Sequence, residues 1–410
     1  MIAATAGSAG SAGSAGRGAA GGPTGPAGPA GSTGRECNCP CADCPGCPDV
    51  ALVGCDAVKS PYFINVCCDC GPAINQPCIC QPNTRNDGIR IAIEDVGTCV
   101  LGTVVLVTGS SIDTTYFLYQ IEELAARGYR VIAMTLRGNG DGDQPRGPYS
   151  YDVWADDLRQ VLDCLGVDDV TLVGHSAGSG TVLHYVARHQ SCRVGRIVLA
   201  STEWLDTNGA GYPVTLAAAN VLLAMMRIDY PAAIEGLIEA TFAPQIPTPA
   251  TFQYVVRSAL KTRLYAAIEQ VTYEAITAPA GNVLLNDLPS VTVPTLILHG
   301  VLDVIAPFEI ALQLAAGIPG SELVPFPASG HNLMLSFEPG FIGPGQKFTE
   351  EVAAFASQGT CAMCPPDPNA PAPTLRAPTP TPARAILDLA SLPTARRIIG
   401  WTLDGPVYEP

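Results

Sequence analysis

The sequence predicts an α/β fold in which helices flank a mostly parallel central sheet, with a helical cap insertion and a low-complexity, Cys-rich N-terminal extension. Short β-branched runs alternate with amphipathic helices from about residue 83 onward, which is typical of βαβ units. Hydrophobic residues make up 47% of the 410 residues and charged residues only 14%, a balance that suits a buried parallel sheet. An Ala- and Leu-rich stretch at about 201–289 separates two of the predicted strands, and we expect it to form a cap above the sheet.

The charge balance excludes two classes of partner. The formal net charge is -15, whereas nucleic acids and anionic membranes are bound by clustered Lys and Arg. The longest apolar run, Leu216 to Met226, contains Asn220 and is shorter than the roughly 18 residues that span a bilayer. No transmembrane segment and no signal peptide are predicted. The default expectation is a cytoplasmic location, although the Cys-rich segment leaves an oxidising or surface location open.

Residues 1–36 form a tail composed almost entirely of Gly, Ala, Ser, Pro and Thr. Such a segment has too little apolar surface to build a core. Glycine recurs at every third position from Gly22 to Gly34, as it does in collagen, where only Gly fits at the axis of the triple helix. A flexible tail is the simpler interpretation, and self-association through this collagen-like repeat is the alternative.

Cysteines crowd the next segment, residues 37–82, which contains eleven of the sixteen. A module held together by disulfides is one interpretation, because so short a segment cannot fold on its apolar surface alone. Thiolate zinc binding is another, and its ligands would come from the first five cysteines, since no His precedes His175. Those five are Cys37, Cys39, Cys41, Cys44 and Cys47. An unstructured tail is the third, and the sequence does not choose among them.

The elements of the main domain, 83–358, follow one another as strand and helix. The expected strands before the cap are 89–94, 103–107, 130–134, 169–173 and 196–200. A helix is expected from about Thr115 to Gly128, and a second ends at Gly166. Apolar residues of the second helix fall on one face: Trp154, Leu158, Val161, Leu162 and Leu165.

After the cap, strands are expected at Thr295–Leu298 and Glu322–Phe326. Residues 359–410 are Pro-rich through Pro382, with a short helix expected at 383–392. We expect this C-terminal part to be a tail without chemistry.

Ser176 is the predicted nucleophile. It lies in Gly174-His175-Ser176-Ala177-Gly178, between a predicted strand and a predicted helix, which is the context that makes Gly-x-Ser-x-Gly a strong signal. A sharp turn from strand to helix forces the serine into strained backbone angles, and small neighbours let the helix pass close to the strand. The same turn aims the backbone N–H of Ala177 at the place where an oxyanion would form.

A serine hydroxyl needs a base at neutral pH, and His331 is the predicted one. It lies in a loop after the strand 322–326, and Asp303 lies just beyond the strand 295–298. The interval between them has room for one helix and one strand, so both residues can reach the sheet edge where Ser176 lies. Asp303 would then fix the imidazole tautomer. Glu203 is the alternative acid, while His299 is expected to be structural and His189 to be a solvated helix end.

These motifs resemble the α/β-hydrolase family, in its esterase and cofactor-free haloperoxidase branch. The resemblance rests on the stretch from Tyr149 to Gly178, on Leu136-Arg137-Gly138-Asn139-Gly140, and on Val293 to Gly300, and it covers roughly residues 86–357. It implies an order of Ser, Asp and His along the chain and a second oxyanion donor, the backbone N–H of Ser110. Relatives usually have His before the Gly of this loop, where this chain has Thr108.

The prediction is therefore a serine hydrolase that acts on small to medium hydrophobic carboxylic esters through a Ser176–His331–Asp303 triad and an acyl-enzyme. No metal or organic cofactor is required. Perhydrolysis, lactone cleavage and amide cleavage would use the same residues. The alternative from another class is a surface or structural assembly protein in which the hydrolase domain is an inactive scaffold.

Overall fold

The computed structural model describes residues 62–66, 68–70, 80–82, 89–189, 193–209, 212–358, 398–402 and 405–408. The collagen-like tail, the five zinc-candidate cysteines and the helix expected at 383–392 lie outside these ranges. The interpretations of those segments remain predictions.

The described residues form an eight-stranded sheet in the order β1-β4-β6-β5-β7-β8-β9-β10. Its strands are β1 (Tyr62–Val66), β4 (Ile89–Gly97), β5 (Thr103–Val107), β6 (Arg130–Met134), β7 (Val170–His175), β8 (Val194–Ala200), β9 (Thr295–Gly300) and β10 (Glu322–Phe326). All neighbouring pairs from β6 to β10 are parallel, whereas β4 pairs antiparallel with both β1 and β6. The predicted mostly parallel α/β architecture is confirmed.

The strands expected from the sequence are all present, and β5, β6 and β10 have the predicted bounds. Strand β1 was not expected, because it comes from the segment treated as Cys-rich. It pairs in register with β4, Tyr62 opposite Ile93 and Val66 opposite Ile89. The described residues also form two short two-stranded sheets: β2 (Cys68–Cys70) with β3 (Cys80–Pro82), and β11 (Ile398–Thr402) with β12 (Gly405–Tyr408). The β11–β12 pair lies in the region expected to be a plain tail.

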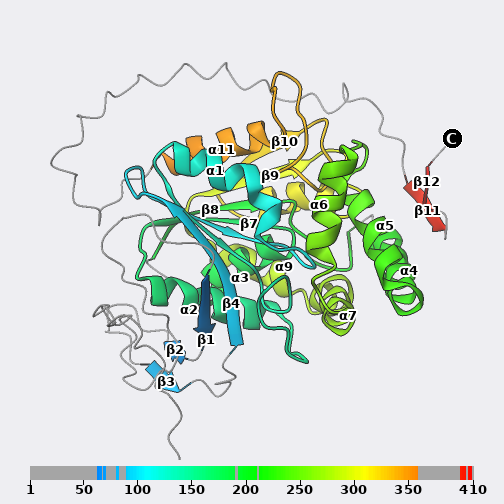
Figure 1. Ribbon diagram of the computed structural model, residues 1–410, viewed down its shortest axis with the longest axis horizontal. Helices are drawn as coiled ribbons and strands as arrows, with labels where there is room; N and C mark the ends of the chain where they lie inside the picture. The colour runs from blue at the N-terminus through cyan, green and yellow to red at the C-terminus, as the bar shows by residue number, and fades with distance from the viewer. Residues whose placement is uncertain are drawn as a thin grey trace, which may run out of the picture. The chain divides into compact units, whose positions relative to one another are not determined.

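Helices cover both faces of the large sheet (Figure 1). One face carries α2 (Tyr151–Leu165) and α3 (Ala177–His189), and the other carries α1 (Leu118–Ala126) and α11 (Gln346–Ala356). The apolar residues predicted for one face of α2 are all buried: Trp154, Leu158, Val161, Leu162 and Leu165. Residues of β5 are fully buried on both faces, as expected for a parallel strand between two helical layers.

Helix α2 ends at Gly166, as the sequence predicts, and begins after a side-chain cap at Ser150. The Ser150 hydroxyl accepts a hydrogen bond from the Val153 N–H at 3.3 Å, and Gly166 ends the helix in the left-handed conformation with φ 58°. A side-chain N-cap of this kind stabilises a helix by about 1 kcal/mol. The caps therefore fix where α2 starts, which matters because its first residue, Tyr151, reaches the candidate active site.

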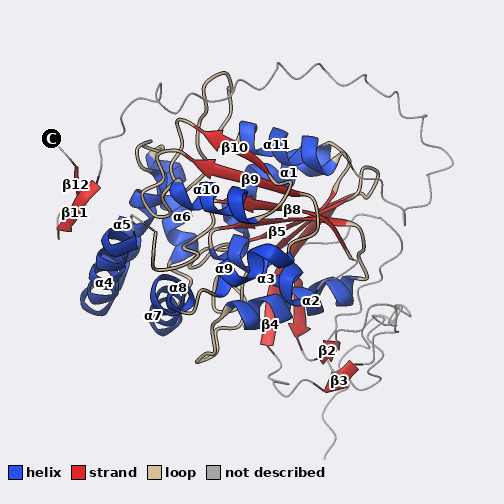
Figure 2. Cartoon of the chain, turned by 180° about the vertical axis from the view of Figure 1, so that it is seen from behind, coloured by secondary structure: helices blue, strands red, loops and turns tan. Residues whose placement is uncertain are grey.

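The expected helical insertion lies between β8 and β9. Its elements are α4 (Tyr212–Ile228), α5 (Tyr230–Phe242), α6 (Pro249–Ala259), α7 (Leu264–Thr272), the π-helical turn η2 (Tyr273–Thr277), α8 (Ala278–Ala280), α9 (Val283–Asp287) and the 3₁₀ turn η3 (Leu288–Ser290). Figure 2 shows helices α4 to α8 on the side toward which the arrowheads of β9 and β10 point. The insertion is therefore placed to cover the carboxyl ends of the strands. Within the described ranges, no helix is both long and apolar enough to cross a membrane.

Candidate active site

Five neighbouring parallel strands carry the predicted site residues at their carboxyl ends. Ser110 follows β5, Ser176 follows β7, Glu203 follows β8, Asp303 follows β9 and His331 follows β10. Carboxyl ends of parallel strands meet at one edge of a sheet, where α/β enzymes bind their ligands. The sheet order therefore brings together residues that are far apart in the sequence.

The turn between β7 and α3 has the strained geometry predicted for a nucleophile. Ser176 has φ 55°, in the left-handed region that few non-glycine residues adopt. A Cβ at Gly174 would lie 2.3 Å from the carbonyl oxygen of Gly178, and a Cβ at Gly178 would lie 2.3 Å from that of Val107. Both glycines are therefore required by close backbone approach. The Ser176 side chain is held between the strand ends, in the position expected of a nucleophile.

His331 and Asp303 form a buried hydrogen-bonded pair. Nδ1 of His331 lies 2.8 Å from Oδ2 of Asp303. The other carboxylate oxygen of Asp303 accepts hydrogen bonds from the N–H groups of Ile305 and Ala306, each at 2.8 Å. One helix and one strand, α10 (Glu309–Gly317) and β10, separate Asp303 from His331, as the sequence predicts. With Asp303 at Nδ1, the Nε2 nitrogen of His331 is the one left for proton transfer.

The electrostatic surroundings favour a charged His331 and neutral neighbouring histidines. Burial alone would lower the pKa of His331, but the carboxylates of Asp303 and Glu203 more than offset it and the pKa is raised. Burial and the charge of His331 hold the pKa of His175 well below its usual value. Burial also lowers the pKa of His299, although Asp303 opposes it. Only His331 of the three is therefore set up to accept a proton.

His175 and His299 support the pair. His175 Nε2 lies 3.0 Å from the backbone oxygen of His331, and the two rings lie 4.9 Å apart between centroids. His299 Nε2 lies 2.7 Å from the Ala306 oxygen and 3.5 Å from Oδ2 of Asp303. The structural role expected for His299 agrees with these contacts.

The loop after β5 lies against the nucleophile, as the assignment of Ser110 as an oxyanion donor requires. A Cβ at Gly109 would lie 3.0 Å from Cβ of Ser176. The Thr108 hydroxyl accepts a hydrogen bond from the Leu136 N–H at 3.3 Å, and the Ser111 N–H donates to Asn139 Oδ1 at 2.9 Å. Hydrogen bonds to Thr108 and Asn139 therefore hold this loop in place. Ala177, the other predicted donor, is the first residue of α3, where N–H groups have no partner within the helix.

Glu203 contacts the nucleophile instead of the imidazole. In the structure, the Ser176 hydroxyl donates a hydrogen bond to Oε1 of Glu203 at 3.0 Å, and the Tyr151 hydroxyl donates to Oε2 at 3.0 Å. Asp303 is the carboxylate bonded to His331, which agrees with the preference for Asp303 over Glu203 as the acid. Within the described residues, no hydrogen bond joins Ser176 to His331.

Glu274, a buried residue that carries no motif in the sequence, lies beside the half-buried Glu203. It lies in η2, accepts a hydrogen bond from the Ser110 hydroxyl, and interacts electrostatically with Glu203. Burial and the charge of Glu203 raise the pKa of Glu274 well above its usual value. Burial also raises the pKa of Glu203, while His331 and the donors Ser176 and Tyr151 counter part of that effect. These effects favour the protonated form of Glu274.

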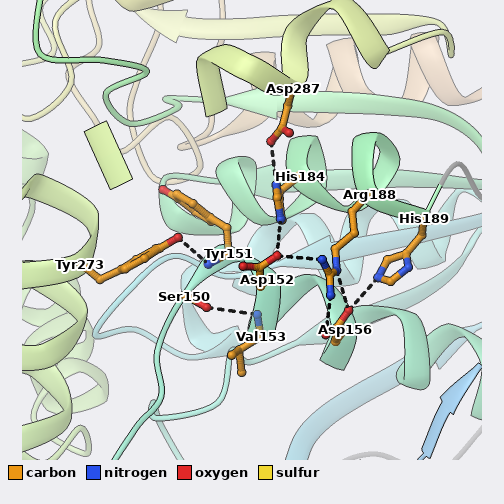
Figure 3. Close-up of polar contacts among 10 residues, drawn as sticks. All are labelled: Ser150, Tyr151, Asp152, Val153, Asp156, His184, Arg188, His189, Tyr273 and Asp287. Carbon is orange, nitrogen blue, oxygen red and sulfur yellow. Dashed lines mark hydrogen bonds and ion pairs between the residues drawn. The ribbon is translucent and has the colours of Figure 1, made fainter. Parts of the chain in front are cut away.

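A charged network fastens α2 to α3 beside the site (Figure 3). His184 lies 2.7 Å from Asp287 and 3.1 Å from Asp152. Burial would lower the pKa of His184, but these two carboxylates raise it. His189 Nε2 lies 3.0 Å from Asp156, and the His189 side chain is only 8% exposed. The expectation of a solvated end at His189 was wrong, because α2 lies against that end of α3.

Comparison with protein families matches residues 102–337 to the family described as alpha/beta hydrolase fold. The match covers every predicted site residue from Ser110 to His331. It leaves both terminal extensions outside.

Individual relatives point to one branch of that family. The chain is similar to an esterase from Exiguobacterium antarcticum, with 32% identity, a TM-score of 0.59, and coverage of 66% of this chain and 96% of that one. It is 32% identical to the AB hydrolase superfamily protein YisY of Bacillus subtilis, over 59% of this chain and 89% of the relative. It is 28% identical to the non-heme chloroperoxidase CPO-A1 of Kitasatospora aureofaciens, over 67% of this chain and 98% of the relative.

Proposed function

This chain belongs to the α/β-hydrolase family, in the branch of esterases and cofactor-free haloperoxidases, and we propose that it cleaves carboxylic esters with a Ser176–His331–Asp303 triad. The family makes it an esterase-like enzyme. What the proposal adds is the triad, the acyl-enzyme and the choice of small esters as substrates.

In the proposed reaction, the Ser176 oxygen attacks the ester carbonyl carbon while His331 takes the hydroxyl proton. The resulting oxyanion is held by the N–H groups of Ala177 and Ser110. When the carbon–oxygen bond breaks, His331 gives its proton to the departing alcohol, which leaves an acyl group on Ser176. Water then repeats these steps, with His331 again as base, and releases the acid.

One observation carries the proposal. Ser176, with φ 55°, lies at a strand-to-helix turn. The buried His331–Asp303 pair lies at the carboxyl ends of β10 and β9 in the same parallel part of the sheet. The raised pKa of His331 suits a group that must be cationic after the first proton transfer. In the proposed reaction the Ser176 hydroxyl, which donates to Glu203 in the structure, donates to His331 instead.

The proposal is tested by measuring hydrolysis of p-nitrophenyl acetate and butyrate and labelling with a fluorophosphonate, on the full chain. We expect both activities to be lost in Ser176→Ala. Ser179→Ala is the matched control, because Ser179 is a buried serine in the first turn of α3, three residues after Ser176, whose hydroxyl contacts Thr202. Ser179→Ala should keep both activities.

Equal background rates in the full chain and in Ser176→Ala, with no label on Ser176, would contradict the proposal. That result would favour the alternative of an inactive hydrolase scaffold in an assembly protein. Perhydrolase, lactonase and amidase activities can be assayed on the same two variants, since all of them would require Ser176.

A further inference from the structure

The Glu203–Glu274 pair is not needed for the proposed ester cleavage, yet it contacts two residues that would surround the substrate. Glu203 accepts the hydrogen bond of the Ser176 hydroxyl, and Glu274 accepts that of the Ser110 hydroxyl. A carbonyl carbon held between Ser176 and the Ser110 N–H would therefore have both carboxyl groups next to it. The substrate atoms bonded to that carbon would therefore be the ones closest to the two carboxyl groups.

The only positive charge that acts on Glu203, among the described residues, is that of His331. Within the described residues, neither Glu203 nor Glu274 forms an ion pair with Lys or Arg. Asp303 also lies in the site, so three carboxyl groups face one histidine that is set up to be cationic. Two carboxyl groups that lie side by side disfavour a double negative charge, so one of them tends to be protonated.

We infer that Glu203 and Glu274 determine specificity by binding a protonated amine, and that the preferred substrates are esters whose acyl group carries an ammonium on the carbon next to the carbonyl. This inference rests on the proposed ester cleavage at Ser176. The ammonium donates hydrogen bonds to both carboxylates, and the proton of the protonated carboxyl group leaves to water. A substrate carboxylate in the same place is repelled.

Geometry supports the position next to the carbonyl. Oε1 of Glu203 lies only 3.0 Å from the Ser176 oxygen that would attack, so a donor that contacts Glu203 must lie close to the bond being formed. An amine on the adjacent carbon is two bonds from the reacting carbon and satisfies this requirement.

Binding of the amine also prepares the nucleophile. The Ser176 hydroxyl now donates to Glu203, and an ammonium that donates to the same carboxylate competes with it. The hydroxyl is then free to turn to Nε2 of His331. A neutral ester of the same shape lacks this effect.

The test compares two substrates of nearly equal shape, alanine methyl ester and methyl 2-methylpropanoate. Acid release is followed by pH-stat at about pH 6.5, below the ordinary pKa of an α-amino group. We expect kcat/KM for the amino ester to exceed that for the neutral ester by about tenfold or more, as for a hydrogen bond to a charged group. Glu274→Gln and Glu203→Gln should each reduce that ratio toward one.

Glu351→Gln is the control variant, since Glu351 is a partly buried glutamate on α11 whose pKa is also raised. It should leave the ratio unchanged. Thermal melting and fluorophosphonate labelling show that each variant is folded, and the ratio within one variant is independent of the amount of active enzyme. Cleavage of the neutral ester at an equal or higher kcat/KM, with a ratio that the two Gln changes do not alter, would overturn the inference and leave the esterase intact. Absence of any Ser176-dependent cleavage would instead refute the proposed function.

Discussion

Replacement of Asp303 by Asn should almost abolish turnover while leaving the fold intact. Oδ2 of Asp303 accepts a hydrogen bond from His331, and Oδ1 accepts two from the N–H groups of Ile305 and Ala306. An amide has one oxygen and one NH₂ group, so it cannot accept at both ends. Either the NH₂ group faces the two backbone donors or it faces Nδ1 of His331, which then becomes an acceptor and places its proton on the wrong nitrogen.

The magnitude follows from that tautomer change. Loss of the correct tautomer in a serine triad lowers kcat by about 10⁴-fold, which corresponds to about 5 kcal/mol of transition-state stabilisation. The assay is kcat for p-nitrophenyl butyrate in Asp303→Asn, with Glu203→Gln measured beside it. Glu203 contacts Ser176 and not the Nδ1 side of His331, so its replacement should cost at least about a hundredfold less.

Two results would refute this reasoning. A decrease of less than about tenfold in Asp303→Asn would show that Asp303 does not fix the tautomer of His331. A decrease in Glu203→Gln as large as that in Asp303→Asn would make Glu203 the acid of the triad, the alternative that the sequence left open. Near-ultraviolet circular dichroism of both variants separates lost chemistry from lost folding.

Three further predictions concern pH and stability. In Glu203→Gln, the acid limb of the kcat/KM profile should move to lower pH, because Glu203 is one of two carboxylates that raise the pKa of His331, the proposed base. Gly178→Ala should lower the melting temperature strongly, because its Cβ would lie 2.3 Å from a backbone oxygen, whereas Gly236→Ala meets nothing within 4 Å and should stabilise by up to about 1 kcal/mol. Asp287→Asn should destabilise the protein by up to about 1 kcal/mol below about pH 6.5, the ordinary pKa of histidine. The destabilisation should be smaller at pH 9. The reason is that the pKa of His184 is raised in the folded protein, and the stability that this gives is lost as pH rises through the raised pKa.

Each of these predictions has a contradicting result. An unchanged acid limb in Glu203→Gln would mean that Glu203 does not raise the pKa of His331. Equal melting temperatures for the two Gly→Ala variants would show that the turn can open without cost. A destabilisation by Asp287→Asn that is the same at pH 5.5 and pH 9, measured by urea unfolding, would mean that the His184 ion pair contributes nothing.

Most of the sheet could be predicted from the sequence because a buried parallel strand is a continuous run of apolar residues. The run Thr103–Val107 is apolar at all but its first position and is buried throughout, so its pattern and its environment agree. Strand β1 and the β11–β12 pair could not be predicted in the same way. Strand β1 comes from the Cys-rich segment and the β11–β12 pair from the C-terminal part, where the sequence has no alternation of strands and helices. Such a strand is defined by the partner that it pairs with, such as Ile89–Ile93 for β1, which no local pattern specifies.

The same distinction explains which site residues were found. Ser176 was predictable because the turn geometry demands Gly174 and Gly178 at fixed spacing, and Asp303 and His331 because each follows a recognisable strand. Glu274 carries no such signal. Its neighbours in the sequence are helical, and only the packing of the insertion over the strand ends brings it to Glu203. In the structure Glu274 lies in a π-helical turn, a feature often found at functional sites, but the sequence does not predict that turn.

The glutamate pair also affects which esters the proposed triad would cleave. A serine triad reacts with many acyl groups, so selectivity must come from what lies next to the reacting carbon. An apolar lining would favour the small hydrophobic esters predicted from the sequence. The carboxyl groups of Glu203 and Glu274, in contact with Ser176 and Ser110, work against such esters, because a neutral substrate would cover them without supplying a partner. A protonated amine supplies that partner, so its hydrogen bonds offset the desolvation of the two carboxyl groups when the preferred substrate is bound.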